Sequence, residues 1–98
     1  MAAAYKLRSK VVPYPGMGGW FFLYVDKKQA AVIREKHAHV KKGFGSIRVR
    51  ATIGKTTWDT SIFPDKRSGT YVLPLKAAVR RAEGLDGGDA VTFVLAIA

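Results

Sequence analysis

Alternating apolar and polar residues along most of the chain predict a protein built mainly from β-strands. Successive side chains of a strand point to opposite faces, so a half-buried strand alternates in sequence. The clearest case is segment 46–53, in which Arg48 and Arg50 share the outward side. Segments 20–25 and 90–97 are apolar on both sides, which is typical of strands that are covered twice. Six strands are predicted, over residues 5–12, 20–25, 46–53, 56–63, 70–73 and 90–97.

Two short helices are predicted between the strands. Asp26 is suited to cap a helix over 27–37, because its carboxylate can accept a backbone N–H of the first turn. Pro74 can open the second helix, where its missing N–H has no partner to lose. Gly84 can end that helix in a left-handed conformation, which residues with a Cβ resist.

The order strand, helix, glycine-containing loop and strand occurs twice, over residues 20–53 and again over 70–97. Two units that cannot bury their own apolar faces are expected to close on each other into one core. With 98 residues, the chain has room for one domain, over 1–98. We expect a monomer, although a dimer is not excluded by the sequence.

The charge balance is strongly basic and favours anionic partners. Lys and Arg number 17 against 7 for Asp and Glu, which gives a formal net charge of +10. A basic surface attracts nucleic acid and other anions through long-range attraction and counterion release. The predicted contact residues lie in the most basic part of the chain: Lys41, Lys42, Arg48 and Arg50. A solvated face that only keeps the protein soluble explains the same charge equally well.

The sequence does not predict an enzyme, a metal site or a bound cofactor. His37 and His39 offer two metal ligands without a third at a fitting position. The carboxylates are scattered, and Thr60-Ser61 has no nearby His that could act as a base. The chain has no Cys, the start lacks an apolar signal stretch, and the longest strongly apolar run is too short to cross a bilayer. We therefore expect a cytoplasmic protein without a membrane partner.

A ligand pocket is the second functional hypothesis. Aromatic faces stack on planar rings, while guanidinium and ammonium groups hold phosphate or carboxylate. Plain core packing explains the aromatic residues as well, because large apolar residues in strands are usually buried. The candidate pocket residues are Trp20, Trp58, Lys66, Tyr71 and Arg80.

The last third of the chain carries the signature of a known fold. Residues 73–80, followed by Gly84-Leu85 and by Gly88-Asp89-Ala-Val91, resemble the signature of the AbrB-like swapped-hairpin domains. The whole chain more specifically resembles a bacterial family named domain of unknown function nineteen-oh-five. The motifs that carry this resemblance are Gly19-Trp20 and segments 43–49, 51–54, 58–64 and 69–74. Many members of that family have Pro where this chain has Asp26.

The resemblance implies a small six-stranded double-split β-barrel, an AbrB-like pseudobarrel with a helix near each end. AbrB-like proteins bind DNA as interlocked dimers of chains about half this length, whereas a lone chain lacks the dyad that half-site recognition needs. We therefore expect a non-catalytic binding module. Nucleic acid, DNA above all, is the first expected partner, a small anionic or aromatic ligand the second, and another protein the third.

Overall fold

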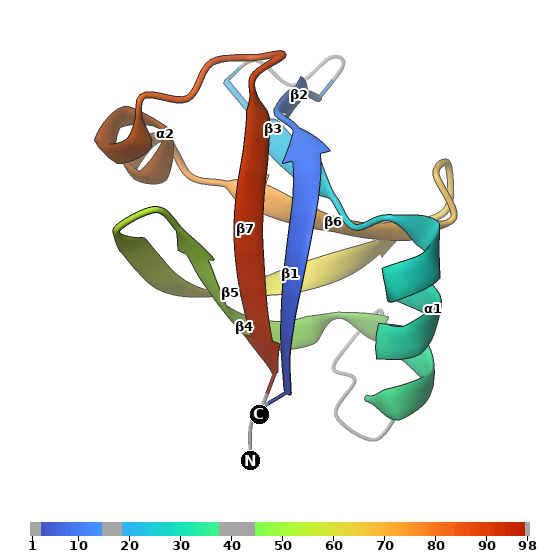
Figure 1. Cartoon of the computed structure of the whole chain (residues 1–98). Helices are drawn as coiled ribbons and strands as arrows, with labels where there is room; N and C mark the ends of the chain where they lie inside the picture. Colours follow the sequence, from blue (N-terminus) through green and yellow to red (C-terminus); the bar gives the residue numbers. More distant parts are fainter. Residues whose placement is uncertain (1–2, 15–18, 38–44, 98) are drawn as a thin grey trace.

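The computed structural model describes residues 3–14, 19–37 and 45–97. They form one seven-stranded antiparallel sheet, curled into a half-barrel, with two helices (Figure 1). The mainly β prediction is therefore confirmed. The elements in chain order are β1 (Ala3–Lys10), β2 (Val12–Pro13), β3 (Phe21–Tyr24), α1 (Lys27–Lys36), β4 (Ile47–Ile53), β5 (Thr56–Asp65), β6 (Thr70–Leu75), α2 (Ala77–Glu83) and β7 (Ala90–Ile97).

The sheet is bent at β5, which belongs to both of its halves. The strand order is β1-β7-β4-β5-β6-β3-β2. Residues 56–62 of β5 pair with β4, and residues 63–65 pair with β6. In Figure 1, β1 and β7 cross in front of β6 and β3. The two halves of the sheet thus face each other across the core.

Alternation along the strands places the core as the sequence predicts. In β4, Ile47, Val49, Ala51 and Ile53 are buried, whereas Arg48 and Arg50 are exposed. Strand β7 also alternates at its start, with Val91 and Phe93 buried and Thr92 exposed. The prediction that β7 is apolar on both faces is half right, because its outward residues are small and only partly covered.

The seventh strand arises because the first predicted strand changes partners. Strand β1 pairs with β7 as far as Lys10. At Val11 the chain turns: its N–H donates to the Asp89 carbonyl at 2.8 Å, and its carbonyl accepts from the Gly88 N–H at 2.7 Å. Val12 then pairs with Phe22 of β3. The predicted strand 5–12 is therefore two strands, and the predicted count of six is wrong.

The described residues do not form the closed six-stranded double-split barrel that the resemblance implies. Strands β1 and β2 are the two ends of the sheet order, and no ladder between the ends is seen in the described part of the chain. One hydrogen bond connects β1 to β3, from the Tyr24 N–H to the Ser9 hydroxyl oxygen at 3.0 Å. The sheet is thus a half-barrel with two edges.

The first helix follows its prediction and the second begins later than expected. The Asp26 carboxylate accepts the Gln29 N–H at 2.8 Å and caps α1. Pro74 lies inside β6 and does not open α2, which starts at Ala77. At Pro74 the strand pairs only with β3, because the pairing with β5 stops at Val72, so the missing N–H leaves no ladder bond unmade. Gly84 ends α2 with φ of 62°, as predicted.

The two predicted repeat units, 20–53 and 70–97, contribute antiparallel partners to one sheet. Strand β3 of the first unit pairs with β6 of the second, and β4 pairs with β7. These pairings bring corresponding strands of the two units together. An origin by duplication stays a prediction.

Candidate nucleic-acid interface

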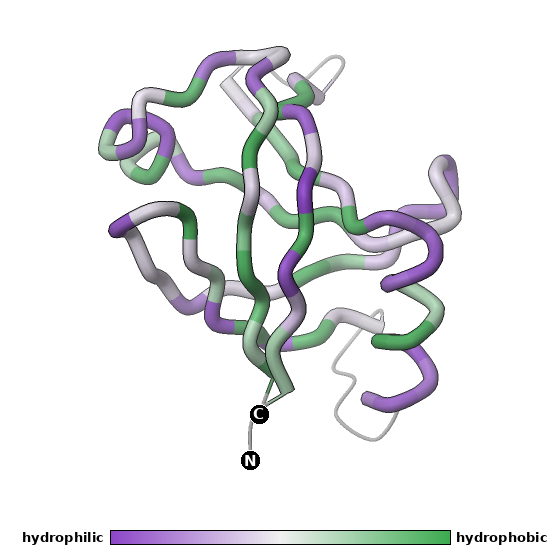
Figure 2. Tube along the Cα trace, in the orientation of Figure 1, coloured by the Kyte–Doolittle hydropathy of each residue, from purple (hydrophilic) through white to green (hydrophobic). Residues whose placement is uncertain are grey.

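Five exposed cations lie on the outer face of β1, β7 and β4, and together we call them the cationic stripe. Strand β1 presents three of them on its exposed positions, and β4 presents two. Figure 2 shows the hydrophilic positions alternating with hydrophobic ones along β1. The stripe consists of Lys6, Arg8, Lys10, Arg48 and Arg50.

The three strands share two outward rows, and each of these rows holds one cation. Lys6 lies opposite Val94 of β7, which in turn lies opposite Thr52 of β4. In the next outward row, Arg50 occupies the β4 position, and Ala96 and Ala4 occupy the others. Arg48 continues the stripe from Arg50 along β4, and Arg8 and Lys10 continue it from Lys6 along β1.

The centre of this face carries small side chains. Strand β7, which lies between the two cationic strands, turns Ala90, Thr92, Val94 and Ala96 outward. These side chains are shorter than Lys and Arg, so the cationic side chains on β1 and β4 can project farther from the sheet than the residues of β7 between them.

One member of the stripe is paired with an acid on the neighbouring strand. The Arg50 Nε lies 2.9 Å from Asp59 Oδ1, and both side chains are largely exposed. The hydrogen bond from Arg50 lowers the pKa of the Asp59 carboxyl, with smaller contributions from the charges of Arg50 and Arg48. The same hydrogen bond raises the pKa of Arg50. Asp59 therefore offsets part of the positive charge of the stripe.

The sequence located only part of this surface. Lys41 and Lys42 lie outside the described residues. Arg48 and Arg50 lie on one outer face, as the alternation of β4 predicts. The β1 cations were visible as one side of an alternating strand, but nothing in the sequence indicates that β1 and β4 flank the same strand. That relationship comes from the pairing of both with β7.

The candidate pocket residues do not converge on one cavity. Tyr71 is buried in the core, with the Arg34 guanidinium 5.6 Å from its ring centroid. Trp58 packs against the core, and its indole N–H has no hydrogen-bond partner among the described residues. The Arg80 guanidinium lies 4.0 Å from the Phe21 ring centroid.

The other two candidates are exposed in separate places. Trp20 is 51% exposed and Phe63 is 41% exposed, and both line an apolar groove of about 520 Å³ together with Pro74 and Lys76. Lys66 is exposed on the turn between β5 and β6. None of the other four predicted pocket residues is among those that line the groove with Trp20.

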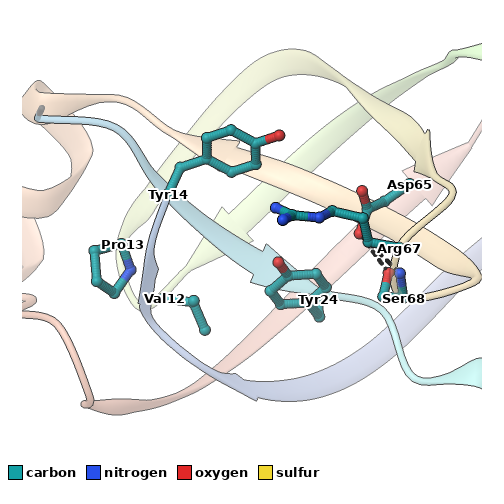
Figure 3. Close-up of a pocket in the computed structure, with 7 residues that line it drawn as sticks. All are labelled: Val12, Pro13, Tyr14, Tyr24, Asp65, Arg67 and Ser68. Carbon is teal, nitrogen blue, oxygen red and sulfur yellow. Dashed lines mark hydrogen bonds between the residues drawn. The ribbon is translucent and has the colours of Figure 1, made fainter. Parts of the chain in front are cut away.

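A second hollow combines the residue types that the pocket hypothesis called for, from other positions. It has a volume of about 280 Å³, and we call it the tyrosine pocket. Figure 3 shows the Arg67 side chain pointing toward the space between the rings of Tyr14 and Tyr24. The residues that line the pocket are Val12, Pro13, Tyr14, Tyr24, Asp65, Arg67 and Ser68.

The histidines and the helices add no further site in the described part of the chain. His37 ends α1, and its Nε2 lies 2.9 Å from the Tyr5 hydroxyl. His39 is outside the described residues. Within the ranges that the structure describes, no three His, Cys, Asp or Glu side chains are grouped as metal ligands would be. Neither α1 nor α2 is long and apolar enough to span a membrane.

Comparison with known proteins connects this arrangement to one family. A family model described as Domain of unknown function (DUF1905) matches residues 8–95. The chain belongs to the DUF1905 family. The DUF1905 match covers β4, the last three residues of β1, most of β7, and the tyrosine pocket. No curated protein matches the chain. The AbrB-like kinship and the bacterial origin of this DUF1905 protein stay predictions.

Proposed function

We propose that this DUF1905 domain binds the phosphate backbone of nucleic acid through the cationic stripe. The observation that carries the proposal is the row-by-row placement of five exposed cations over β1, β7 and β4. Adjacent outward rows of a strand are about 6.7 Å apart, so five rows extend over about 27 Å. At about 3.4 Å per base pair, this length corresponds to roughly eight base pairs of duplex DNA.

The chemistry of the stripe favours contacts to phosphates over contacts to bases. Phosphate contacts position a protein on nucleic acid, whereas sequence is read by side chains that reach base edges in a groove. On this face the residues between the cations are small or apolar, as at Val94 and Ala96. We therefore expect binding that depends strongly on salt and weakly on sequence.

Salt-titrated binding to a fluorescent duplex tests the proposal. If all five cations contact phosphates, the slope of log affinity against log salt is about −4.5, because each contact contributes about −0.9. The double variant Lys6→Gln/Arg8→Gln should reduce the slope by about 2 units and weaken binding to duplexes of different sequence alike. The same titration with a single strand shows which form of nucleic acid is preferred.

A charge-matched variant separates this face from the overall basic charge. Lys27 and Lys28 are exposed in the first turn of α1, on a different element from the cationic stripe. Lys27→Gln/Lys28→Gln removes the same net charge and should leave the salt slope nearly unchanged. Equal weakening by the two double variants would mean that net charge alone attracts DNA, and the stripe would then have no special role.

A second candidate function, self-association, is favoured by the groove that Trp20 and Phe63 line. Both side chains are large, apolar and exposed, and exposed apolar surface of this kind often marks a contact with another protein. Light scattering of the wild type and of Trp20→Ser/Phe63→Ser tests it. A dimer that the double variant dissociates supports self-association, whereas a monomeric wild type at high concentration contradicts it.

A further inference from the structure

We propose that the tyrosine pocket binds a small aromatic anion, a ligand with one planar aromatic group and a phosphate or carboxylate group. The site is distinct from the cationic stripe, and the proposal does not depend on nucleic-acid binding there. It is built at the meeting point of β2, the end of β3 and the turn between β5 and β6. Its chemistry follows from a cation, two phenol rings and an apolar wall.

The cation is Arg67, whose guanidinium forms no ion pair with a carboxylate of the described residues. The ion pair that the described structure contains is Arg50–Asp59. Asp65 also lines the pocket, but its Oδ2 accepts from the Ser68 hydroxyl at 2.7 Å and from the Ser68 N–H at 3.2 Å. These bonds, with the Gly69 N–H to the Asp65 carbonyl at 2.9 Å, fix the turn that presents Arg67. A planar guanidinium can hold phosphate or carboxylate with two parallel hydrogen bonds.

The two tyrosines are held in place by the surrounding structure. The Tyr14 N–H donates to the Trp20 carbonyl at 2.9 Å, and its ring packs edge-on to Phe22 at 4.9 Å between centroids. Tyr24 ends β3, and its N–H donates to the Ser9 hydroxyl oxygen. The rings offer flat faces to a planar ligand, and the hydroxyls can donate to an anion. Both contributions are available without rearrangement of the backbone.

The size and the wall of the pocket limit the ligand. A volume of about 280 Å³ is small for a binding site, and the Val12 and Pro13 side chains line one wall. An apolar wall beside a guanidinium suits a ligand with a ring at one end and charge at the other. Free inorganic phosphate would leave the ring-sized part of the pocket to water, and an uncharged ring would leave Arg67 unpaired. Both halves of the ligand are therefore required.

Titrations followed by NMR chemical shifts of the ¹⁵N-labelled protein test the proposal with four probes. Phenyl phosphate and adenosine monophosphate carry ring and charge, whereas inorganic phosphate and adenosine each carry one of the two. The ring phosphates should shift the Tyr24 and Arg67 amides and bind at least tenfold more tightly than either single-feature probe. Equal affinity for inorganic phosphate and phenyl phosphate would overturn the proposal, because the rings would then contribute nothing.

Variants on one turn separate the site from general charge. Arg67→Gln should weaken phenyl phosphate binding roughly 10- to 100-fold, the range expected for removal of a charged hydrogen-bond donor. Lys66→Gln removes the same charge from the neighbouring exposed residue, which does not line the pocket, and should change affinity less than twofold. Tyr24→Phe keeps the ring and should weaken binding less than Arg67→Gln does. Equal losses for Lys66→Gln and Arg67→Gln would overturn the assignment.

A free small ligand and the 5′ end of a nucleic-acid strand can both present an aromatic group with a phosphate. Two titrations distinguish these sources. A short single strand with a 5′ phosphate is titrated beside adenosine monophosphate, into both the wild type and Lys6→Gln/Arg8→Gln. Adenosine monophosphate binding that the double variant leaves unchanged supports a free small ligand. If only the phosphorylated strand shifts the pocket amides, the proposed small-ligand site is overturned in favour of a strand end.

Discussion

The Arg50 guanidinium and the Asp59 carboxylate face each other across β4 and β5, with the Arg50 Nε 2.9 Å from Asp59 Oδ1. Arg50 belongs to the cationic stripe, whereas the negative charge of Asp59 opposes the binding of a polyanion. A phosphate that contacts Arg50 must compete with the carboxylate for the same donor. We therefore expect Asp59 to weaken the proposed binding of nucleic acid.

Replacement of Asp59 should strengthen nucleic-acid binding. Asp59→Asn removes one negative charge beside the stripe and releases Arg50, so the affinity for duplex DNA should rise severalfold at low salt, and the gain should fade as salt screens the charges. Glu35→Gln is the matched control, since Glu35 is an exposed acid on α1. Fluorescence anisotropy measures both. A gain of equal size for the control would point to net charge, not to Arg50.

The stability conferred by the same pair should depend on pH in a defined direction. The pKa of Asp59 is lowered by Arg50, so the folded protein binds its proton less readily than the unfolded chain does. The contribution is therefore fully present above the ordinary carboxyl pKa, and it is lost as pH falls through the lowered value. Because both groups are exposed, it is small and screened by salt.

Urea unfolding of the wild type and of Asp59→Asn at low salt measures this effect. The wild type should be slightly more stable at neutral pH, and the difference should shrink toward zero in acid. Arg50→Gln should show the same convergence with the wild type. If the stability difference between the wild type and Asp59→Asn persists unchanged in acid, it arises from packing or strand propensity and not from the charge of Asp59.

Adjacent residues near the end of β5 should differ strongly in how much their substitution destabilises the protein. Ile62 is fully buried, whereas Phe63 is substantially exposed. Ile62→Ala should lower the free energy of unfolding by about 2 to 5 kcal/mol, because it leaves a cavity in the core. Phe63→Ser should change it by only about 0.5 kcal/mol, as is usual for surface positions. Urea unfolding of both variants checks the difference, and similar losses would contradict the assigned faces.

The cap of α1 should contribute measurably to stability. Asp26→Ala removes the acceptor of the Gln29 N–H and should lower the free energy of unfolding by about 1 kcal/mol. Glu35→Ala, on the exposed face of the same helix, should have little effect. Thermal unfolding followed by circular dichroism compares them. Equal losses would indicate that the helix responds to charge or propensity and not to its cap.

Local rules explain why much of the fold was predictable. The Asp26 cap, the Gly84 stop and the alternation in β4 each depend on a few neighbouring residues, and the structure confirms all three. The start of α2 was misjudged because Pro74 satisfies two local rules equally well. A proline can open a helix, and it can also lie in a strand where no ladder bond is lost. Only the extent of the β5–β6 pairing decides between them.

The sites were less predictable, because they depend on contacts between distant segments. The tyrosine pocket joins Tyr14 to Arg67 across more than fifty positions of sequence. The sequence predicted a pocket of aromatic and cationic residues that included Lys66, whereas its neighbour Arg67 lines the proposed tyrosine pocket. Nothing local distinguishes two adjacent basic residues on a turn. The side chain that enters the pocket is decided by the fold of the turn.

The change of partner at Val11 has a consequence for how the domain holds its shape. Strands β1 and β2 stand at opposite ends of the sheet order, yet a single residue joins them along the chain. The backbone at Val11 therefore links the two edge strands covalently, although no hydrogen-bond ladder joins them among the described residues. The curled sheet cannot flatten unless at least one of the strand ladders opens. Its curvature is enforced by connectivity, and a cut at Val11 would remove that restraint while leaving the strand ladders themselves intact.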